Sequence, residues 1–401
     1  MFVALAVLGS TTCGGVENAA DDGGSTASGS SSGSSPGDAG PALGACGGYA
    51  WGPDWPGSAG QPTAPAALPP LYPAPDCGPG CRMVGTRLNF GVFEPQEFRF
   101  SGGRMVSTPF DHERADVNFV DLATGTDFEA AAEAPEPGFG SSSQAIMGAD
   151  CFAKAYTHVD DSQRRTYVCE VCASTSATRL LAFADGLDDI GEGGLHTHES
   201  SGRYLVLEHR EALEVIDTHD GSSHIVSESK GVFSEVSTRE PYLVFPEANG
   251  HIWLVDVRDW SRTSLGDDRA RQDMPSSDGK TVVWIDYSAG ERTSDVVVYD
   301  IETQSLTRVT DAQKPAIRSN PTVEGDRVAW MESQSGYAAV IRGYNLGTKE
   351  EMLLVDHTAG EVEELSPKWP QLHGGKLYFV GTNVPSTTPN QLYELVLPPD
   401  P

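Results

Sequence analysis

The chain has 401 residues, of which 38% are hydrophobic and 21% charged, and this is enough apolar content for a large folded body. Its formal net charge is -30, from 57 acidic and 27 basic side chains. A surface this acidic repels a phosphate backbone, so the composition argues against nucleic acid as a partner.

The chain begins with MFVALAVLGSTTC, in which a short apolar run and small residues lead to Cys13. This pattern resembles the signal sequence of a bacterial lipoprotein, whose cysteine is lipidated after the apolar stretch. The resemblance implies export to the periplasm or the cell surface and a lipid anchor at Cys13. A cleaved signal peptide without a lipid is the alternative. No later segment has the length and apolar character of a membrane span, so we expect membrane contact only through the anchor.

The next part of the chain, residues 14–60, is rich in Gly and Ser, as in GGSTASGSSSGSSPGDAGP. It has too few large apolar side chains to offset the entropy of ordering its backbone, so we predict a disordered tether. Residues 61–81 form an irregular lead-in that is rich in Pro and contains two cysteines, and residues 82–401 are the predicted folded body.

Within this body, apolar runs that end in an acidic or amide residue and a turn occur seven times. The residues at that position are Asp121, Glu170, Asp217, Asp256, Asp300, Asn345 and Glu394. Successive copies are 39 to 49 residues apart. A second apolar run lies upstream of each, usually just after a glycine, which is typical of the start of a strand. The pattern predicts roughly four strands in each repeat of ~45 residues.

A repeat of this length and content is typical of β-propeller blades. The copies PSSDGKTVVWIDYSAGERTSDVVVYDIETQSLTRVTD and PTVEGDRVAWMESQSGYAAVIRGYNLGT resemble the repeats of TolB-like propellers, which are related to WD repeats. We therefore predict an all-β propeller with seven blades, and six or eight blades stay open. The resemblance implies protein partners in a bacterial envelope.

The last copy ends at Pro398, just after its third strand, so its outermost strand is missing. The strand-like run RMVGTRLNF, residues 82–90, precedes the first copy and has no other assignment. We predict that an N-terminal strand from this region completes the last blade and covers its open edge.

Six cysteines follow Cys13, and an even number in an exported chain favours disulfides over a metal site. In the second copy, a strand at 150–157 that returns as 166–172 would place Cys172 directly opposite Cys151, close enough for a cross-strand disulfide.

Cys77 and Cys81 are separated by Gly-Pro-Gly and could close a small loop of their own. Cys46 and Cys169 are then left over, and the sequence alone does not pair them.

The sequence offers little catalytic chemistry, and we predict no catalytic residue and no cofactor. His196 and His198 are alternate residues of a predicted strand and could share one ion, but no further ligand is indicated, so they are weak metal candidates. The string GSSSG at 29–33 matches a nucleophile-elbow pattern, but it lies in the tether without the required strand and helix.

In propellers, the innermost strands line a central channel whose mouth is the usual place for a ligand. The predicted innermost strands place five polar or aromatic residues near that mouth. They are His196, Glu235, Asp273, Asn320 and Trp369. Packing in the core for Trp369 and turn formation for the Asp and Asn residues are the structural alternatives.

The sequence thus supports two functional hypotheses. The first is a monomeric, non-catalytic envelope lipoprotein whose propeller binds proteins or acts as a scaffold. The second is a propeller enzyme, a lyase or hydrolase that acts on a polysaccharide or a lactone at the channel mouth. A convergent acid, base and metal group at the mouth would favour the enzyme.

Overall fold

In the computed structural model, the described residues are 49–51, 80–84, 97–101, 104–108, 116–123, 127–132, 140–146, 151–159, 164–172, 177–185, 196–200, 203–209, 212–228, 236–247, 250–266, 271–288, 290, 293–310, 316–333, 339–356, 364–384 and 391–398. All of them belong to one compact unit, Leu43–Pro401, and the other unit, Met1–Ala42, lies outside them. Their regular structure consists of strands alone. No helix of the described part is long and apolar enough to cross a membrane.

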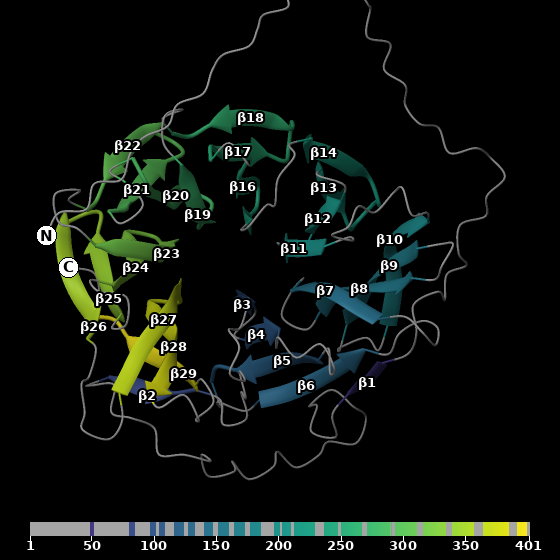
Figure 1. Ribbon diagram of the computed structural model, residues 1–401, viewed down its shortest axis with the longest axis horizontal. Coiled ribbons are helices and arrows are strands. Elements are labelled where there is room, and N and C mark those ends of the chain that lie inside the picture. Colours follow the sequence, from purple (N-terminus) through teal and green to yellow (C-terminus); the bar gives the residue numbers. More distant parts are fainter. Residues whose placement is uncertain are drawn as a thin grey trace, which may run out of the picture. The chain divides into compact units, whose positions relative to one another are not determined.

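The described strands form seven antiparallel sheets around a central axis (Figure 1). In each sheet we call the strand nearest the centre the first strand and count outward from it. From the centre outward, the first sheet contains β3 (Glu97–Ser101), β4 (Arg104–Thr108), β5 (Asp116–Asp121), β6 (Asp127–Ala132) and β1 (Tyr49–Trp51). The second contains β7 (Gly140–Ile146), β8 (Cys151–Val159), β9 (Arg164–Cys172) and β10 (Ala177–Asp185). The third contains β11 (His196–Ser200), β12 (Tyr204–His209), β13 (Ala212–Asp217) and β14 (Ser223–Ser227).

The remaining four sheets repeat the same order. The fourth contains β15 (Ser237–Arg239), β16 (Tyr242–Pro246), β17 (Ile252–Asp256) and β18 (Ser261–Ser264). The fifth contains β19 (Gln272–Ser277), β20 (Thr281–Asp286), β21 (Asp295–Asp300) and β22 (Ser305–Arg308). The sixth contains β23 (Ile317–Glu324), β24 (Arg327–Ser333), β25 (Ala339–Asn345) and β26 (Glu350–Val355). The seventh contains β27 (Glu364–His373), β28 (Lys376–Val384), β29 (Gln391–Val396) and β2 (Cys81–Met83).

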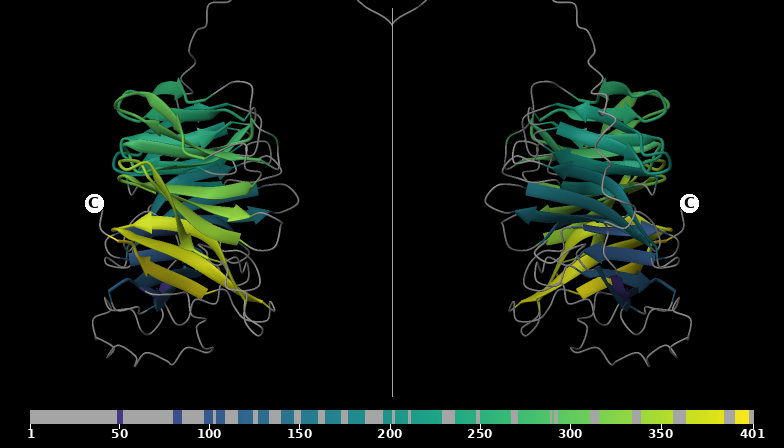
Figure 2. Two further views of the ribbon diagram at one scale, coloured as in Figure 1. Left: turned by 90° about the vertical axis from the view of Figure 1, so that its left-hand side faces the viewer. Right: turned by 90° about the vertical axis from the view of Figure 1, so that its right-hand side faces the viewer.

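Each of the seven repeat copies lies in its own sheet, with its two predicted runs as the second and third strands. In side view the strands run between the two faces of the ring (Figure 2). The apolar residues of these strands are buried between consecutive sheets rather than within one sheet. Val296, Val298 and Val309 of the fifth sheet, for example, pack on Val323 and Trp330 of the sixth. The hydrophobic core is therefore divided among the contacts between neighbouring sheets.

Turns at the ends of the first strands also join neighbouring sheets. The Gly325 N–H donates a 2.8 Å hydrogen bond to the Asp278 carboxylate of the fifth sheet. In the same way, the N–H groups of Gly374 and Gly375 donate to the two carboxylate oxygens of Glu324, at 2.8 and 3.1 Å. Each of these sheets thus fixes the turn of the next one.

The seventh sheet is built from both ends of the chain. Its outer strand is β2, which pairs with β29 so that Arg82 lies opposite Glu394. The Glu394 carboxylate, 2% exposed, accepts hydrogen bonds from Arg82 Nε at 3.0 Å and Tyr378 Oη at 2.9 Å, and it lies 3.0 Å from Lys376 Nζ. Burial opposes the charged form of Glu394, but the hydrogen bonds from these neighbours hold its pKa below the ordinary value. The β2 strand starts in the lead-in, one residue before the predicted body.

The first sheet has a fifth strand that the sequence pattern does not predict. Residues 49–51 fall in the range 14–60 expected to be a tether, but they form β1, which pairs with β6 so that Tyr49 lies opposite Ala132 and Trp51 opposite Ala130. Glycines and prolines flank this three-residue strand, and they hide it from a sequence pattern.

Candidate functional site

The candidate site lies on the first strands, which are nearest the central axis (Figure 1). In the third, fifth, sixth and seventh sheets the pairing of the first strand with the second shifts at the same place. The shifts lie between Thr197 and Ser200, Asp273 and Ser276, Ser319 and Thr322, and Lys368 and Gln371. Each leaves two residues of the first strand unpaired in a β-bulge, a feature that redirects side chains.

Three of these bulges share an unusual backbone conformation. Met274, Asn320 and Trp369, which we call the bulge row, have positive φ angles of 55, 49 and 47°. A positive φ is uncommon for any residue with a Cβ and is a marked outlier for Met and Trp. Each residue precedes a proline, which has no N–H to donate to the ladder. One strained bulge therefore recurs on the central strands of three neighbouring sheets.

The bulge row combines different chemical groups, all half-buried. The Asn320 N–H donates to the Met274 sulfur at 3.4 Å, which joins the fifth and sixth sheets. The Trp369 indole packs partly on the cluster of Phe100 and Tyr378, and Lys368 Nζ lies 5.5 Å from its ring centre. A thioether, an amide, an indole and an ammonium group are thus present on adjacent central strands.

The structure places two of the predicted mouth residues, Asn320 and Trp369, in the bulge row. Asp273 lies one residue before Met274 and is only 8% exposed. Its carboxylate accepts hydrogen bonds from Arg271 Nη2 at 2.8 Å and from the Met274 N–H at 3.0 Å. Asp273 therefore supports the bulge. Met274 was missed because Met carries no catalytic signal, although its position before a proline, shared with Asn320 and Trp369, could have identified it.

Two of the other predicted site residues lie on β11. His196 lies on β11 opposite Glu208, and His198 lies within the bulge of that strand. Glu235 lies outside the described residues. Among the side chains that are described, no group of three or more His, Cys, Asp or Glu residues could hold a metal ion.

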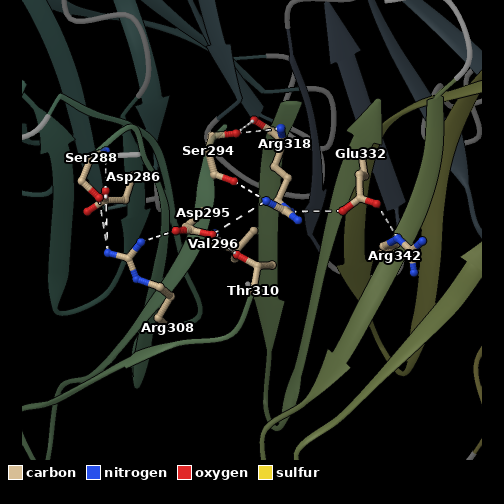
Figure 3. A network of polar contacts seen from close by, with 10 residues as sticks. All are labelled: Asp286, Ser288, Ser294, Asp295, Val296, Arg308, Thr310, Arg318, Glu332 and Arg342. Carbon is tan, nitrogen blue, oxygen red and sulfur yellow. Dashed lines mark hydrogen bonds and ion pairs between the residues drawn. The ribbon is translucent and has the colours of Figure 1, made fainter. Parts of the chain in front are cut away.

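A second cluster of charged groups lies between the fifth and sixth sheets (Figure 3). Asp295, which is fully buried, contacts Arg308 and also lies 3.8 Å from Arg318 Nη1. Arg318 Nε donates to Glu332 at 3.1 Å, and the other oxygen of Glu332 accepts from Arg342 Nε at 2.7 Å. Each buried carboxylate thus lies between two guanidinium groups, so the cluster is a structural network in which every charge is paired.

An apolar cavity of about 110 Å³ lies between the sixth and seventh sheets. Gly343, which lines it, has Val298 at the matching position of the fifth sheet, and Leu354 fills the space that a side chain at Gly343 would need. The residues that line it include Val328, Gly343, Tyr344, Met352, Leu372 and Leu397. None of the bulge row lines the cavity, so the two features are separate.

No protein family model matches the sequence, and no curated protein matches it. Solved structures do match. An oligogalacturonate lyase from Vibrio parahaemolyticus is 10% identical and has a TM-score of 0.50, with 79% of this chain and 97% of that chain covered. The β-propeller domain of the Trilobed protease from Pyrococcus furiosus is 10% identical, with a TM-score of 0.48 and coverages of 75% and 92%. TolB from Acinetobacter baumannii is 11% identical, with a TM-score of 0.36 and coverages of 74% and 78%.

Identities this low show the fold alone. The chain is an all-β protein with the fold of a β-propeller, as its repeats predict, and TolB is among the similar structures. A likeness at this identity shows the fold alone and does not choose between the two functional hypotheses.

Proposed function

We propose that this protein is an exported propeller, anchored by a lipid at Cys13, that binds an extended segment of a partner protein at the centre of its ring. The observation that carries the proposal is the bulge row, a strained conformation that recurs on three neighbouring central strands. Strain of this kind persists where the surrounding structure maintains it, and it is concentrated at functional sites.

A protein segment suits this surface for two reasons. Each first strand pairs with only one strand of its own sheet, so its other edge is directed to the centre, where an extended peptide can add hydrogen bonds. Trp369 and Lys368 add an aromatic surface and a cation beside that edge, and aromatic side chains are enriched at protein interfaces. The mixed chemistry of the row fits recognition of a peptide better than a single reaction.

The binding proposal is tested by site-specific photo-crosslinking in envelope extracts of the source cells. A photoreactive residue replaces Trp369 in one variant and Leu306 in the control. Leu306 is 56% exposed on the outer strand β22, far from the first strands in its sheet. We expect a discrete cross-linked protein from position 369 and none from position 306. No product at 369, or equal products at both positions, would overturn the proposal.

The rival proposal is a lyase or hydrolase that acts on a polysaccharide or lactone at the same place. It is supported by the position of His196 and His198 on β11, another central strand with a bulge. Metal analysis and melting with and without a chelator separate the two proposals. The binding proposal predicts an unchanged melting temperature, whereas a stoichiometric ion whose removal lowers it would favour the enzyme and direct mutagenesis to the two histidines.

A further inference from the structure

Three cysteines of the described part, Cys81, Cys151 and Cys169, are disulfide-bonded. The sequence suggests partners for Cys81 and Cys151 but leaves Cys169 without one. Cys169 is fully buried on β9, the third strand of the second sheet. Its partner can be identified from the strand register and from the faces of this sheet.

The register excludes the two cysteines nearest to Cys169. On β8 and β9, Cys151 lies opposite Cys172, whereas Cys169 lies opposite Lys154. Cys169 is thus three residues along the strand from both, a distance of about 10 Å, and cysteines whose Cα atoms are more than about 7 Å apart cannot be bridged. The partner of Cys169 must therefore come from outside this hairpin, and Cys151 and Cys172 are left opposite each other.

The direction of the Cys169 side chain shows where that partner lies. Cys151, Ala153 and Val168 pack with residues of the third sheet, so the face that carries them is directed to that sheet. Cys169 is one residue from Val168 and lies on the opposite face, because side chains alternate along a strand. That face is directed to the first sheet, the other neighbour in the ring (Figure 1).

The outer strand of the first sheet is β1, and Cys46 precedes its first residue, Tyr49, by only three positions. Three residues span at most about 10 Å, so the chain allows Cys46 to reach only the surroundings of Tyr49 at the edge of the first sheet. Cys81 is the first residue of β2, which lies on the seventh sheet, and Cys77 precedes it by four positions in the sequence. Since the first sheet separates the seventh from the second, neither of these two cysteines suits Cys169.

We propose that Cys46 and Cys169 form a disulfide. This bond attaches the N-terminal segment, which supplies β1 to the first sheet and β2 to the seventh, to the second sheet as well. The segment is then held at three places. The disulfide binds it to the second sheet, β1 to the first sheet, and β2 to the seventh. The two remaining disulfides join Cys151 to Cys172 and Cys77 to Cys81.

Formation of the bond is an exchange with a protein dithiol–disulfide oxidant of the exported compartment. The Cys46 and Cys169 thiols lose two protons and two electrons as their S–S bond forms, and the disulfide of the oxidant takes these up and becomes a dithiol. The cross-link encloses the first sheet and most of the second in one covalent loop. A force on the N-terminus is thereby transmitted to β9 through the disulfide, and β1 and β2 stay paired in their sheets.

The pairing is tested by mass spectrometry of the full chain after non-reducing digestion with trypsin, Glu-C and Asp-N, with free thiols alkylated beforehand. These proteases separate every relevant cysteine, because Glu170 lies between Cys169 and Cys172, and Asp54 and Asp76 lie between Cys46 and Cys77. We expect the fragment 38–53 to be linked to 166–170, and 150–154 to be linked to 171–179. An alkylated Cys46, or a 166–170 fragment bonded to any other cysteine, would overturn the proposal.

A second test measures how much the disulfide between Cys46 and Cys169 stabilises the folded protein. The variant Cys46→Ala opens a loop of more than a hundred residues, whereas the control Cys77→Ala opens a loop of four, and both changes lie in the N-terminal segment. Since the stabilisation from a disulfide grows with the length of its loop, we expect Cys46→Ala to lower the melting temperature by about 5–10 °C and Cys77→Ala by clearly less. Equal shifts in melting temperature for the two variants, or no shift for Cys46→Ala, would contradict the proposed disulfide.

Discussion

Two parts of this molecule use buried carboxylates in the same way but join very different parts of the chain. Between the fifth and sixth sheets, Asp295 and Glu332 each lie between two guanidinium groups, from residues 10 to 23 positions away. In the seventh sheet, Glu394 lies between Lys376 and Arg82, and Arg82 is 312 residues away in the sequence. The first cluster joins consecutive repeats, and the second joins the two ends of the chain.

The last repeat differs from the others in what the residue at the terminal acidic or amide position contacts. Asp256, Asp300 and Asn345, at the same repeat position as Glu394, accept N–H groups from their own turns at 2.7 to 3.0 Å. Glu394 instead contacts groups of β2 and β28. A residue that accepts hydrogen bonds from a local turn in these three copies thus holds the N-terminal strand in the last one. Joining residues this distant in sequence costs more loop-closure entropy than joining residues of one turn.

The largest expected effect is at the fifth-to-sixth junction. Replacing Arg318 by Met leaves Asp295 and Glu332 buried with one cation each, and loss of one partner from a buried ion pair costs about 3–5 kcal/mol. Denaturant unfolding measures this loss. Arg308→Met is the matched control, because its side chain is 40% exposed and water can replace it. Equal losses in the two variants would mean that burial of Arg318 does not decide its contribution.

The next largest effect is expected at Glu394, which we compare with Asp300 at the same repeat position. Glu394→Gln weakens charge-assisted hydrogen bonds to Arg82 and Lys376, and we expect a loss of about 1–3 kcal/mol in the free energy of unfolding. The control Asp300→Asn keeps an oxygen acceptor for its exposed turn and should cost less than about 0.5 kcal/mol. A loss for Asp300→Asn as large as that for Glu394→Gln would remove the distinction between the two positions.

Acid should weaken the junction of the seventh and first sheets. Burial lowers the pKa of His373, which stacks on Phe100 of the first sheet at 4.8 Å, while Glu324 acts against this shift and Arg239 supports it. The unfolded chain therefore binds the proton more strongly. The stability that His373 contributes is present above its ordinary pKa of 6.5 and is lost as the pH falls below it.

The lowered pKa of Glu394 acts in the same direction at lower pH, below its ordinary value of 4.5. His373→Phe keeps a ring against Phe100 but cannot take up a proton. Denaturant unfolding at pH 7 and pH 5.5 should show a smaller loss for His373→Phe than for the natural chain. The same loss in both proteins would show that His373 does not cause the acid sensitivity.

The smallest effect concerns a turn of the sixth sheet. Lys349 has a φ of 61° at a place where the third sheet has Gly221, with a φ of 77°. Lys349→Gly removes the cost of this conformation for a residue with a Cβ and should raise the free energy of unfolding by about 0.5–1 kcal/mol. The matched change Lys280→Gly, at an exposed residue outside the positive-φ set, should not stabilise the protein. Stabilisation by both would point to a general effect of removing lysine.

Much of the fold could be predicted from sequence, because each repeat carries its own apolar runs and a terminal acidic or amide residue, and most carry a turn glycine. The position of Cys151 opposite Cys172 followed from the same local logic and is confirmed in the register. The charged network around Arg318 could not be predicted, because it depends on how neighbouring sheets meet. The bulge at Met274 also escaped, since a bulge shifts the alternation on which strand prediction depends.

The candidate site was predicted only in part. Asn320 and Trp369 were selected because they precede the glycines of their repeats, but no sequence pattern indicated their shared backbone strain. That strain arises from the surrounding sheets, and no single residue reveals it. The function could not be predicted from the sequence, because the thioether, amide and indole of the bulge row do not form a known catalytic motif.

The N-terminal strand β2 completes the last sheet by pairing with β29, and hydrogen exchange of β29 measures what this pairing contributes. Val84 donates its N–H to the Leu392 carbonyl at 2.8 Å, and Val84→Pro removes this donor. We predict faster exchange in residues 391–396 of the variant, with exchange in β21 unchanged. Unchanged exchange in β29, or an equal increase in β29 and β21, would contradict completion of the last sheet by β2.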